Sequence, residues 1–356
     1  MKVLLIIDHA PDYREAFFRE LGKKVDLTVA AQPCRSAGLA PPERRVGYRY
    51  IEVPARQFKG FYWQPDLKKL LYKENWDVVC CDINLRQLAR LFLFVTNRKW
   101  WDRWVWRGLI FGQSNLKILG MIRKFLFNRA AGCLVYSEEV ARRVKQEYGA
   151  DAISFNNTEV RRDEFRTGKF DADHEKLRLI FVGTFKPRKK LERLVRLAEN
   201  RPDVSIRVIG PGMEQLEFPD GLENNGRLEV FGRLTGKDLN THFDWSDLVV
   251  SPGNVGLLVM NAARHGKGIV IDDNSYHGPE YWLAKESGQP FISFCDMQEV
   301  NRFIDDVIDN RRKLQHWGRK LQEVAKEKYT IEYMAEAHYR VFEKVAESGK
   351  TVISRQ

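Results

Sequence analysis

The sequence predicts an α/β fold made of two Rossmann-like, doubly wound domains that face a central cleft. Its 356 residues exceed the size at which one hydrophobic core keeps growing, so two domains are expected. Short, continuously apolar runs alternate with amphipathic runs along almost the whole chain, a pattern typical of parallel sheets covered by helices on both faces. The hydrophobic share of 44% and the charged share of 30% are ordinary for a soluble globular protein.

The first domain is expected over residues 1–160. Its opening run, MKVLLIID, is too short for a secretory leader and is followed at once by acidic and turn residues, so it is interpreted as the first strand. The strand-like runs are residues 2–8, 26–32, 48–54, 76–82, 105–112 and 132–137. The helical runs are residues 14–24, 65–74, 85–94, 116–126 and 138–149.

A polar segment without apolar periodicity follows, and residues 161–175 are expected to be a linker. A second domain is expected over residues 176–328. Its strand-like runs are residues 177–183, 204–210, 227–232, 247–253, 268–273 and 290–294. Its helical runs are residues 189–200, a helix beginning near Leu257, residues 279–287 and a long stretch over 297–327.

The last segment, residues 329–356, is predicted to be a helix that begins after Thr330 as its N-cap. Its apolar residues recur at helical spacing and form one stripe, made of Ile331, Met334, Ala335, His338, Phe342 and Val345. A stripe of this kind needs a partner surface. We expect the helix to pack back on the N-terminal domain.

Composition restricts the partners and the compartment. The net charge of +11 indicates an anionic partner without saying which. The five cysteines have no CxxC spacing and are interpreted mainly as buried, reduced thiols of a cytosolic protein. No apolar run approaches the length that a membrane span needs, so the chain is not expected to cross a bilayer.

Two turns of the second domain carry the chemistry. Residues 251–280 read SPGNVGLLVMNAARHGKGIVIDDNSYHGPE, in which a glycine-rich turn from Gly253 to Gly256 leads into a helix at Leu257. Backbone amides at such a turn suit a phosphate, although the glycines could serve only to make the turn tight. The earlier turn FVGTFKPRKK carries Lys186, Arg188, Lys189 and Lys190 after Gly183, and could equally be a solvated basic face. Two turns at one sheet edge favour a shared diphosphate ligand.

The order FVGTFKPRKKLERLV, RVIGPG, LEVFGRL, DLVVSPGNVGLLVMNAARHGKGIVIDD and HGPE resembles the C-terminal domain of GT-B glycosyltransferases, especially the retaining family 4 group. The resemblance covers residues 175–300 well and the N-terminal half more loosely. It places the first glycine at Gly183 and the diphosphate-binding lysine at Lys189. Thr184 stands where an arginine is usual, so Lys186 or Arg188 would supply that charge.

The resemblance also shows two departures from the family pattern. The two glutamates of the E-x7-E element fall on Gly253 and Asn261, so both carboxylates are lost, although Asn261 can still hydrogen-bond a ribose hydroxyl. Glu280 matches a later acidic position, and its neighbour His277 could touch phosphate or sugar or be merely solvated. The donor-binding set that the resemblance implies is completed by Asn254, Val255, Gly256 and Leu257, with Gly210, Gly232 and Arg233 near the base.

The N-terminal domain is expected to hold the acceptor. The resemblance implies acceptor contacts from the turn with His9, Tyr13 and Arg14, and from Ser114. Gln113 falls where many relatives carry a catalytic-site histidine, so it joins Lys189, Arg188 and Glu280 in the expected catalytic set. No evident general base is present, which a retaining enzyme tolerates because the leaving diphosphate is thought to take the acceptor proton.

No cofactor and no metal ion are expected. The one Asp-x-Asp sequence, Asp171-Ala172-Asp173, falls in the expected linker and not at a strand end. GT-B enzymes generally use basic side chains and helix ends in place of a metal to stabilise the departing diphosphate.

Residues 86–129 hold ten Lys and Arg residues and one acid, Asp102, interleaved with tryptophan and phenylalanine. Part of the stretch reads as a core strand. The rest suits an anionic membrane surface, with Trp100, Trp101 and Trp104 at headgroup depth and the cations on phosphates. The protein is therefore expected to be cytoplasmic and peripherally associated with the inner face of the plasma membrane.

The leading interpretation is a retaining glycosyltransferase that uses a UDP- or GDP-linked sugar and a lipid-linked or polysaccharide-precursor glycan acceptor. It would act in the biosynthesis of a cell-surface polysaccharide such as lipopolysaccharide. A catalytically silent GT-B homologue that binds a nucleotide sugar or a partner enzyme is the main alternative, supported by Gly253 and Asn261. Epimerisation or phosphorolysis by the same fold, and nucleic-acid binding through the basic tryptophan-rich stretch, are less favoured. Nucleic acid is not expected as a partner.

Overall fold

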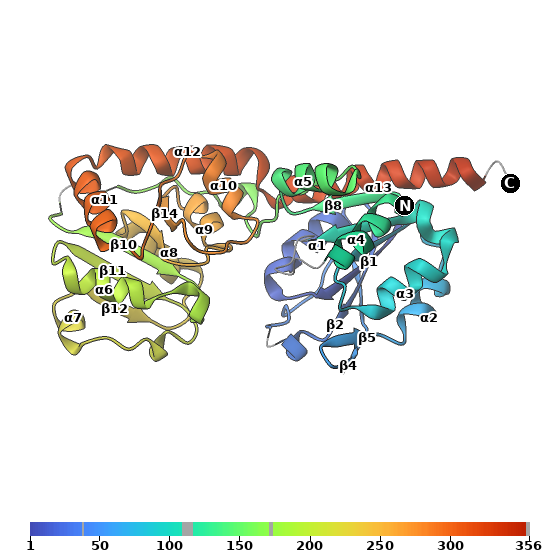
Figure 1. Cartoon of the computed structure of the whole chain (residues 1–356), viewed down its shortest axis with the longest axis horizontal. Coiled ribbons are helices and arrows are strands. Elements are labelled where there is room, and N and C mark those ends of the chain that lie inside the picture. Colours follow the sequence, from blue (N-terminus) through green and yellow to red (C-terminus); the bar gives the residue numbers. More distant parts are fainter. Residues whose placement is uncertain (38, 109–116, 171–173, 354–356) are drawn as a thin grey trace. The chain divides into compact units, whose positions relative to one another are not determined.

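The computed structural model describes residues 1–37, 39–108, 117–170 and 174–353, and the chain divides into two compact units (Figure 1). Unit 1 contains Met1–Glu159 and Ile331–Gln356, and unit 2 contains Val160–Thr330. The backbone therefore leaves unit 1 once and returns to it with the last helix.

Unit 1 contains a seven-stranded sheet in the order β3-β2-β1-β6-β7-β8-β9, and all neighbouring strands are parallel. The strands are β1 (Lys2–His9), β2 (Asp26–Gln32), β3 (Arg49–Glu52), β6 (Val78–Asp82), β7 (Trp104–Gly108), β8 (Gly132–Val135) and β9 (Ile153–Ser154). The chain builds outward from β1 on one side and from β6 on the other. The topological switch point of this sheet therefore lies between β1 and β6.

Helices cover both faces of this sheet. They are α1 (Glu15–Gly22), α2 (Leu67–Lys73), α3 (Leu88–Thr96), α4 (Lys117–Arg129), α5 (Glu138–Tyr148) and α13 (Ile331–Ile353). Short 3-10 turns are η1 (Asp12–Arg14), η2 (Cys34–Ala37) and η3 (Arg98–Arg103). The stripe of α13 that begins at Ile331 is buried in the same core as Phe17, Phe18 and Leu21 of α1. This packing places the last helix in unit 1.

The sequence pattern missed a small antiparallel hairpin, β4 (Arg56–Phe58) and β5 (Phe61–Trp63). Its turn needs a positive φ at Lys59 (46°) and at Gly60 (81°). A lysine-glycine pair is a weak turn signal compared with asparagine-glycine, and neither strand alternates apolar and polar residues.

Unit 2 contains a six-stranded parallel sheet in the order β12-β11-β10-β13-β14-β15. The strands are β10 (Leu177–Val182), β11 (Val204–Ile209), β12 (Leu228–Phe231), β13 (Leu248–Ser251), β14 (Gly268–Asp272) and β15 (Phe291–Ile292). The helices are α6 (Glu192–Asn200), α7 (Asp220–Asn224), α8 (Gly236–Trp245), α9 (Leu258–Arg264), α10 (Tyr281–Glu286), α11 (Met297–Asp309) and α12 (Arg312–Lys328). Its switch point lies between β10 and β13. The predicted class, α/β with two doubly wound domains, is confirmed.

Two details differ from the expected organisation. The long helical stretch after residue 296 is two helices, α11 and α12, and not one. Val160, the last residue of the expected first domain, is buried in the core of unit 2, and Phe165 and Phe170 of the expected linker lie against that core. Within the described parts of the chain, no helix is long and apolar enough to cross a membrane.

Candidate functional site

The two turns singled out in the sequence lie at the switch point of unit 2. Gly183 follows β10, and the turn from Pro252 to Leu257 follows β13, the neighbouring strand. Gly210 follows β11 with φ +147°, and a Cβ there would lie 1.8 Å from the Gly183 carbonyl oxygen. Only glycine fits at position 210, so the loop after β11 packs directly against the backbone of the turn after β10.

Lys189 joins the two turns directly. It ends the 3-10 helix η5 (Pro187–Lys189), and its Nζ donates hydrogen bonds to the carbonyl oxygens of Asn254 (2.6 Å) and Val255 (3.3 Å). Burial, and next the charge of Arg188, lower the pKa of Lys189 to about 8, while Glu280 favours its charged form. A partly buried ammonium at a glycine turn is a suitable group to receive a diphosphate.

Gly253 is the position where the family pattern has a glutamate, and the structure gives a physical reason for the change. A Cβ at Gly253 would lie 2.5 Å from the carbonyl oxygen of Arg188 and 2.8 Å from that of Lys189. The Asn254 N–H also donates to the Arg188 carbonyl at 3.0 Å. The backbone of η5 thus occupies the space of the missing side chain and brings Lys189 closer to the turn.

His277 clamps the glycine turn to the loop after β14. Its Nδ1 accepts the Val255 N–H at 3.3 Å, and its Nε2–H donates to the Asp272 carbonyl at 2.7 Å. Burial lowers its pKa, and its ring stacks on Tyr281 with centroids 4.7 Å apart. Asn254 adds a second link, from its Nδ2 to the Tyr276 carbonyl at 2.8 Å. His277 is therefore a neutral positioning residue in this ligand-free arrangement and is not merely solvated.

Glu280 lies directly before α10 and is only 7% exposed. Its carboxylate turns back over Gly278, where an added Cβ would meet Oε2 at 2.6 Å. Asn261, the other departure from the family pattern, lies half-buried on α9. Gly256 has φ +56°, and a Cβ there would be 3.7 Å from Lys189 Nζ. Gly256 thus lies beside the Lys189 ammonium, and the Glu280 carboxylate is near enough to favour the charged form of that ammonium.

The remaining expected donor residues share the sheet edge but lie farther out. Thr184, Lys186 and Arg188 are exposed on the first turn. Gly232 and Arg233 follow β12, the edge strand two places from β10, and both are exposed. These residues therefore spread along the sheet edge from the switch point toward β12.

Sequence reasoning missed Arg193 on α6. Its Nη1 lies 2.8 Å from the buried Asp272 carboxylate and donates to the Pro252 carbonyl at 2.6 Å, and its Nη2 approaches the Sγ of exposed Cys295 at 2.8 Å. Arg193 therefore fixes the start of the glycine turn from below. The sequence signal for Arg193 was Asp272, an aspartate at the end of an apolar strand. A carboxylate buried at such a position needs a cation as its partner.

In unit 1, the expected acceptor residue His9 ends β1, and Tyr13 and Arg14 lie on η1 just after it. His9 Nε2 is 3.2 Å from Ser36 Oγ, and burial lowers its pKa. Arg14 donates to the Thr158 carbonyl at 3.4 Å and lies over the exposed Tyr13 ring at 5.3 Å. Gln113 and Ser114 lie outside the described residues, as do Asp171 and Asp173.

The switch point of unit 1 holds a polar cluster that the sequence analysis did not single out. Asp8 is the penultimate residue of β1 and lies 2.7 Å from the guanidinium of buried Arg90, while Asn84 Nδ2 donates to its other oxygen at 3.0 Å. Asp82 ends β6 and pairs with buried Arg107 at 2.6 Å. Both carboxylates keep partial exposure, 33% and 21%. Each carboxylate is bound by a buried arginine on its core side and is partly exposed to solvent on its other side.

The expected membrane contact by Trp100 and Trp104 is wrong. Trp100 is 7% exposed, and Trp104 and Trp106 are fully buried, all in one core with Phe94. Trp104 and Trp106 lie two residues apart on β7 and so point to the same face of the sheet, and that face is packed in the core that also contains Phe94 and Trp100 of η3. Trp101 alone of these rings is partly exposed, and it stacks on Phe94.

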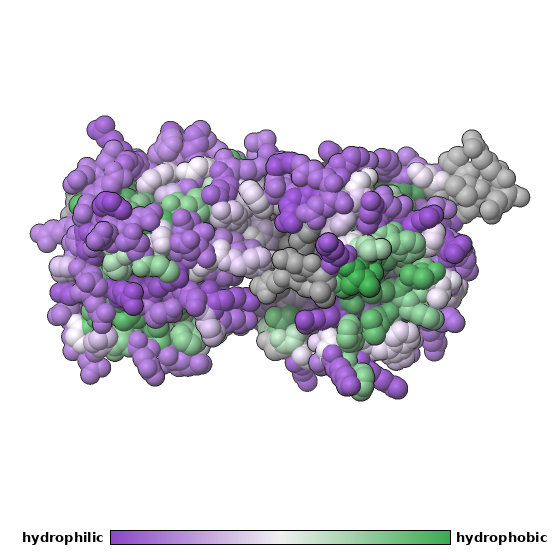
Figure 2. Space-filling view, viewed as in Figure 1, coloured by the Kyte–Doolittle hydropathy of each residue, from purple (hydrophilic) through white to green (hydrophobic). Residues whose placement is uncertain are grey.

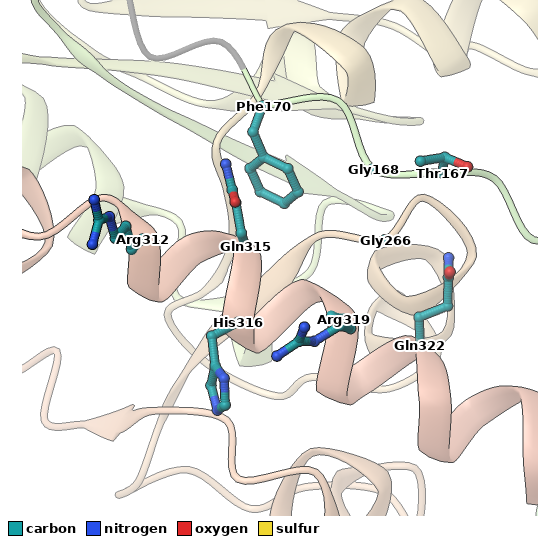
Figure 3. Close-up of a pocket in the computed structure, with 9 residues that line it drawn as sticks. All are labelled: Thr167, Gly168, Phe170, Gly266, Arg312, Gln315, His316, Arg319 and Gln322. Atoms are coloured by element: carbon teal, nitrogen blue, oxygen red, sulfur yellow. The ribbon is translucent and has the colours of Figure 1, made fainter.

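A hollow of about 490 Å³ lies elsewhere on unit 2 (Figure 3). It is lined by Thr167, Gly168, Phe170, Gly266, Arg312, Gln315, His316, Arg319 and Gln322. Gly266 precedes β14, so the hollow is at the amino ends of the strands, opposite the edge where ligands of doubly wound sheets bind. In Figure 3 Arg312, His316 and Arg319 point away from Phe170. The hollow is therefore separate from the turns after β10 and β13.

Comparison with known proteins gives a family match for part of the chain and several structures of similar fold. Residues 163–324 match the family described as "Glycosyl transferases group 1". No curated protein sequence matches the chain. The sucrose-phosphate synthase of Thermosynechococcus elongatus has 13% identity and a TM-score of 0.68, with 100% of both chains covered.

Two further solved structures are similar in fold. Anabaena HepE in complex with UDP-glucose has 14% identity and a TM-score of 0.63, covering 99% of this chain and 100% of its own. WaaG, a glycosyltransferase involved in lipopolysaccharide biosynthesis, has 10% identity and a TM-score of 0.60, covering 96% of this chain and 99% of its own. At these identities the likeness establishes the fold.

Proposed function

We propose that this chain, whose residues 163–324 form a group 1 glycosyltransferase domain within a GT-B fold, transfers a sugar from a nucleoside-diphosphate sugar to a glycan acceptor with retention of configuration. The observation that carries the proposal is the contact between Lys189 Nζ and the carbonyls of the glycine turn at the switch point. The donor is a UDP- or GDP-linked sugar, and the UDP-glucose complex of HepE supports a uridine donor.

Lys189 stabilises the leaving diphosphate in this proposal. Its Nζ exchanges two neutral carbonyl partners for anionic phosphate oxygens, which hold the ammonium in its charged form. Arg188 and Lys186, exposed on the same turn, add positive charge. These cations supply the charge stabilisation that a metal ion would otherwise provide, and no cofactor takes part. Glu280 accepts hydrogen bonds from ribose hydroxyls, with Asn261 as a weaker second partner.

The acceptor binds unit 1 in this proposal. Asp8 and Asn84 offer hydrogen-bond partners for sugar hydroxyls at the switch point, beside the turn with His9 and Arg14. Gln113 and Ser114 stay predictions for the same role. The proton of the attacking hydroxyl passes to the leaving diphosphate oxygen, so no side-chain base is needed for retention.

The acceptor is a lipid-linked or polysaccharide-precursor glycan, and the reaction belongs to the biosynthesis of a cell-surface polysaccharide. The role of WaaG in lipopolysaccharide biosynthesis supports this class of acceptor. The enzyme acts at the inner face of the plasma membrane as a peripheral protein, consistent with a net charge of +11.

The test is nucleotide release from a panel of UDP- and GDP-sugars, with and without added acceptor glycans. Release that depends on one donor and falls in Lys189→Ala supports the proposal. A silent homologue, favoured by the loss of carboxylates at Gly253 and Asn261, would bind a nucleotide sugar in calorimetry without releasing nucleotide. That outcome would overturn the enzymatic role and keep the binding site.

A further inference from the structure

Two helices of unit 1 expose their apolar residues to solvent. Surface helices normally turn polar residues outward. On α3 the outward residues are Leu88, Phe92 and Val95, at positions i, i+4 and i+7, with exposures of 39, 52 and 48%. This stripe is additional to the inward one, because Leu93 and Phe94 are buried in the core.

α4 repeats the arrangement. Its outward stripe holds Ile118, Met121, Ile122 and Phe125, and the first two are 63 and 72% exposed. Leu126 and Phe127 form the inward contact with the core. Two successive helices with an exposed stripe at helical spacing are unlike scattered surface leucines, which need no explanation.

The hairpin β4–β5 extends the same surface. Phe58 is 72% exposed, Phe61 45% and Trp63 41%. The Trp63 ring lies 5.7 Å from Phe92 of α3. Trp101 of η3 contacts Phe94 on one side and Phe125 of α4 on the other, at 5.6 and 6.1 Å. These ring contacts connect the hairpin, α3 and α4.

We call this surface the apolar patch of unit 1. It consists of Phe58, Phe61, Trp63, Leu88, Phe92, Val95, Ile118, Met121, Ile122 and Phe125. Figure 2 shows hydrophobic residues gathered on the face of unit 1 that carries α3 and α4 in Figure 1.

The charges around the patch are almost all positive. Exposed cations on the hairpin, η3 and α4 are Arg56, Lys59, Arg98, Lys99, Lys117, Lys124 and Arg129. Lys59 lies over the Phe58 ring at 5.5 Å, and Arg129 over the Trp101 ring at 5.5 Å. Asp102 is the one acid in β4, β5, α3, η3 and α4. The patch is therefore apolar with a cationic border.

This combination distinguishes between occupants. A second copy of the chain would bring two cationic borders together, which like-charge repulsion opposes. A nucleic acid would pair with the cations and leave Ile118, Met121 and Phe92 in water. An anionic bilayer satisfies both features, because apolar side chains enter the boundary with the acyl chains and lysine and arginine lie at the phosphates.

We propose that the apolar patch of unit 1 is the surface by which the protein docks on an anionic lipid leaflet. Residues 58–63, outside the stretch singled out by composition, belong to it, and Trp100 and Trp104 do not. The proposal rests on the proposed function for its purpose, which is to bring the enzyme to a lipid-linked acceptor.

The test is co-sedimentation of the full chain with phosphatidylcholine vesicles that do or do not contain phosphatidylglycerol. The variant Ile118→Ser/Met121→Ser/Phe125→Ser removes three exposed side chains, so its fold should be retained and circular dichroism should match the wild type. We expect wild-type binding to the anionic vesicles that weakens in salt, and at least about tenfold weaker binding by the variant. The matched control Val46→Ser/Ile153→Ser removes apolar side chains of 45 and 46% exposure outside the patch and should bind like wild type.

Three results would overturn the docking surface. They are equal binding to both vesicle types, unchanged binding by the triple variant, and a solution dimer that dissociates in that variant while vesicles are ignored. Nucleotide release measured without vesicles separates this proposal from the proposed function. A protein that binds anionic vesicles through the patch but releases no nucleotide keeps the docking surface and loses the enzymatic role.

Discussion

Lys189 allows a quantitative test, because its ammonium is partly buried and its pKa of about 8 lies within the working range of pH. Burial favours the neutral form, so raising the pH through 8 removes the charge that the diphosphate needs. At pH 7 about nine tenths of the free protein is charged, and at pH 9 about one tenth. We therefore expect kcat/KM for the donor to fall about tenfold between pH 7 and pH 9.

A bound diphosphate stabilises the ammonium, so kcat at saturating donor should begin to fall only at higher pH than kcat/KM. Removing the group altogether in Lys189→Ala should lower turnover by about 10²-fold or more, since charge stabilisation of a leaving group contributes about 3–4 kcal/mol. The assay is initial-rate nucleotide release over a series of pH values.

The controls use neighbouring charges. Lys189→Arg keeps a cation at every accessible pH. The changed geometry should lower its activity, but its kcat/KM should no longer fall as the pH rises through 8. Lys190→Asn removes an equal charge one residue away at a left-handed position (φ 55°) that asparagine tolerates, and should keep the wild-type profile. A flat wild-type profile from pH 7 to 9, or the same limb in Lys189→Arg, would refute the assignment of this group to the diphosphate.

Other changes separate the remaining roles. Glu280→Gln should weaken UDP or GDP binding about tenfold in calorimetry with little effect on unfolding, and unchanged affinity would move the ribose elsewhere. Asp8→Asn should raise the acceptor KM about tenfold or more while acceptor-free donor hydrolysis stays constant; a loss of hydrolysis would speak for a general folding defect. Gly253→Ala places a Cβ 2.5 Å from the Arg188 carbonyl oxygen, so it should lower the free energy of unfolding by about 1–3 kcal/mol in urea and weaken donor binding; wild-type values for both would contradict the tight packing of η5.

The sequence was sufficient for the fold because alternation of apolar and amphipathic runs is a local signal. It was also sufficient to predict that Gly183, Lys189 and Gly253 lie at one sheet edge, since they follow strands of one sheet and the carboxyl ends of parallel strands meet there. Their role in donor binding stays a proposal. The family resemblance, drawn from the order of these turns, is confirmed by the match of residues 163–324 to the group 1 glycosyltransferases.

Contacts between distant elements were harder to predict. Arg193 and Asp272 are separated by 79 positions in the sequence. No local pattern shows which strand end a given helix arginine will contact. Asp8 and Asp82 each follow an apolar run, which is visible in the sequence, but their proximity follows only from the strand order β1-β6. Asp8 and Asp82 could have been identified by one rule: look for an aspartate at the end of each buried strand that borders a switch point.

The tryptophan-rich stretch shows a different limit. Composition counts rings and cations but does not say which side of an element faces water, and α3 is apolar on both sides. Phe94 is buried and Phe92 is 52% exposed, two positions apart on the same helix. The anionic partner inferred from composition is kept as a proposal, while the residues that would meet it shift from Trp100 and Trp104 to the outward stripes. A helix whose apolar residues exceed one stripe therefore indicates a second contact surface, and the cations beside that surface indicate the charge of its partner.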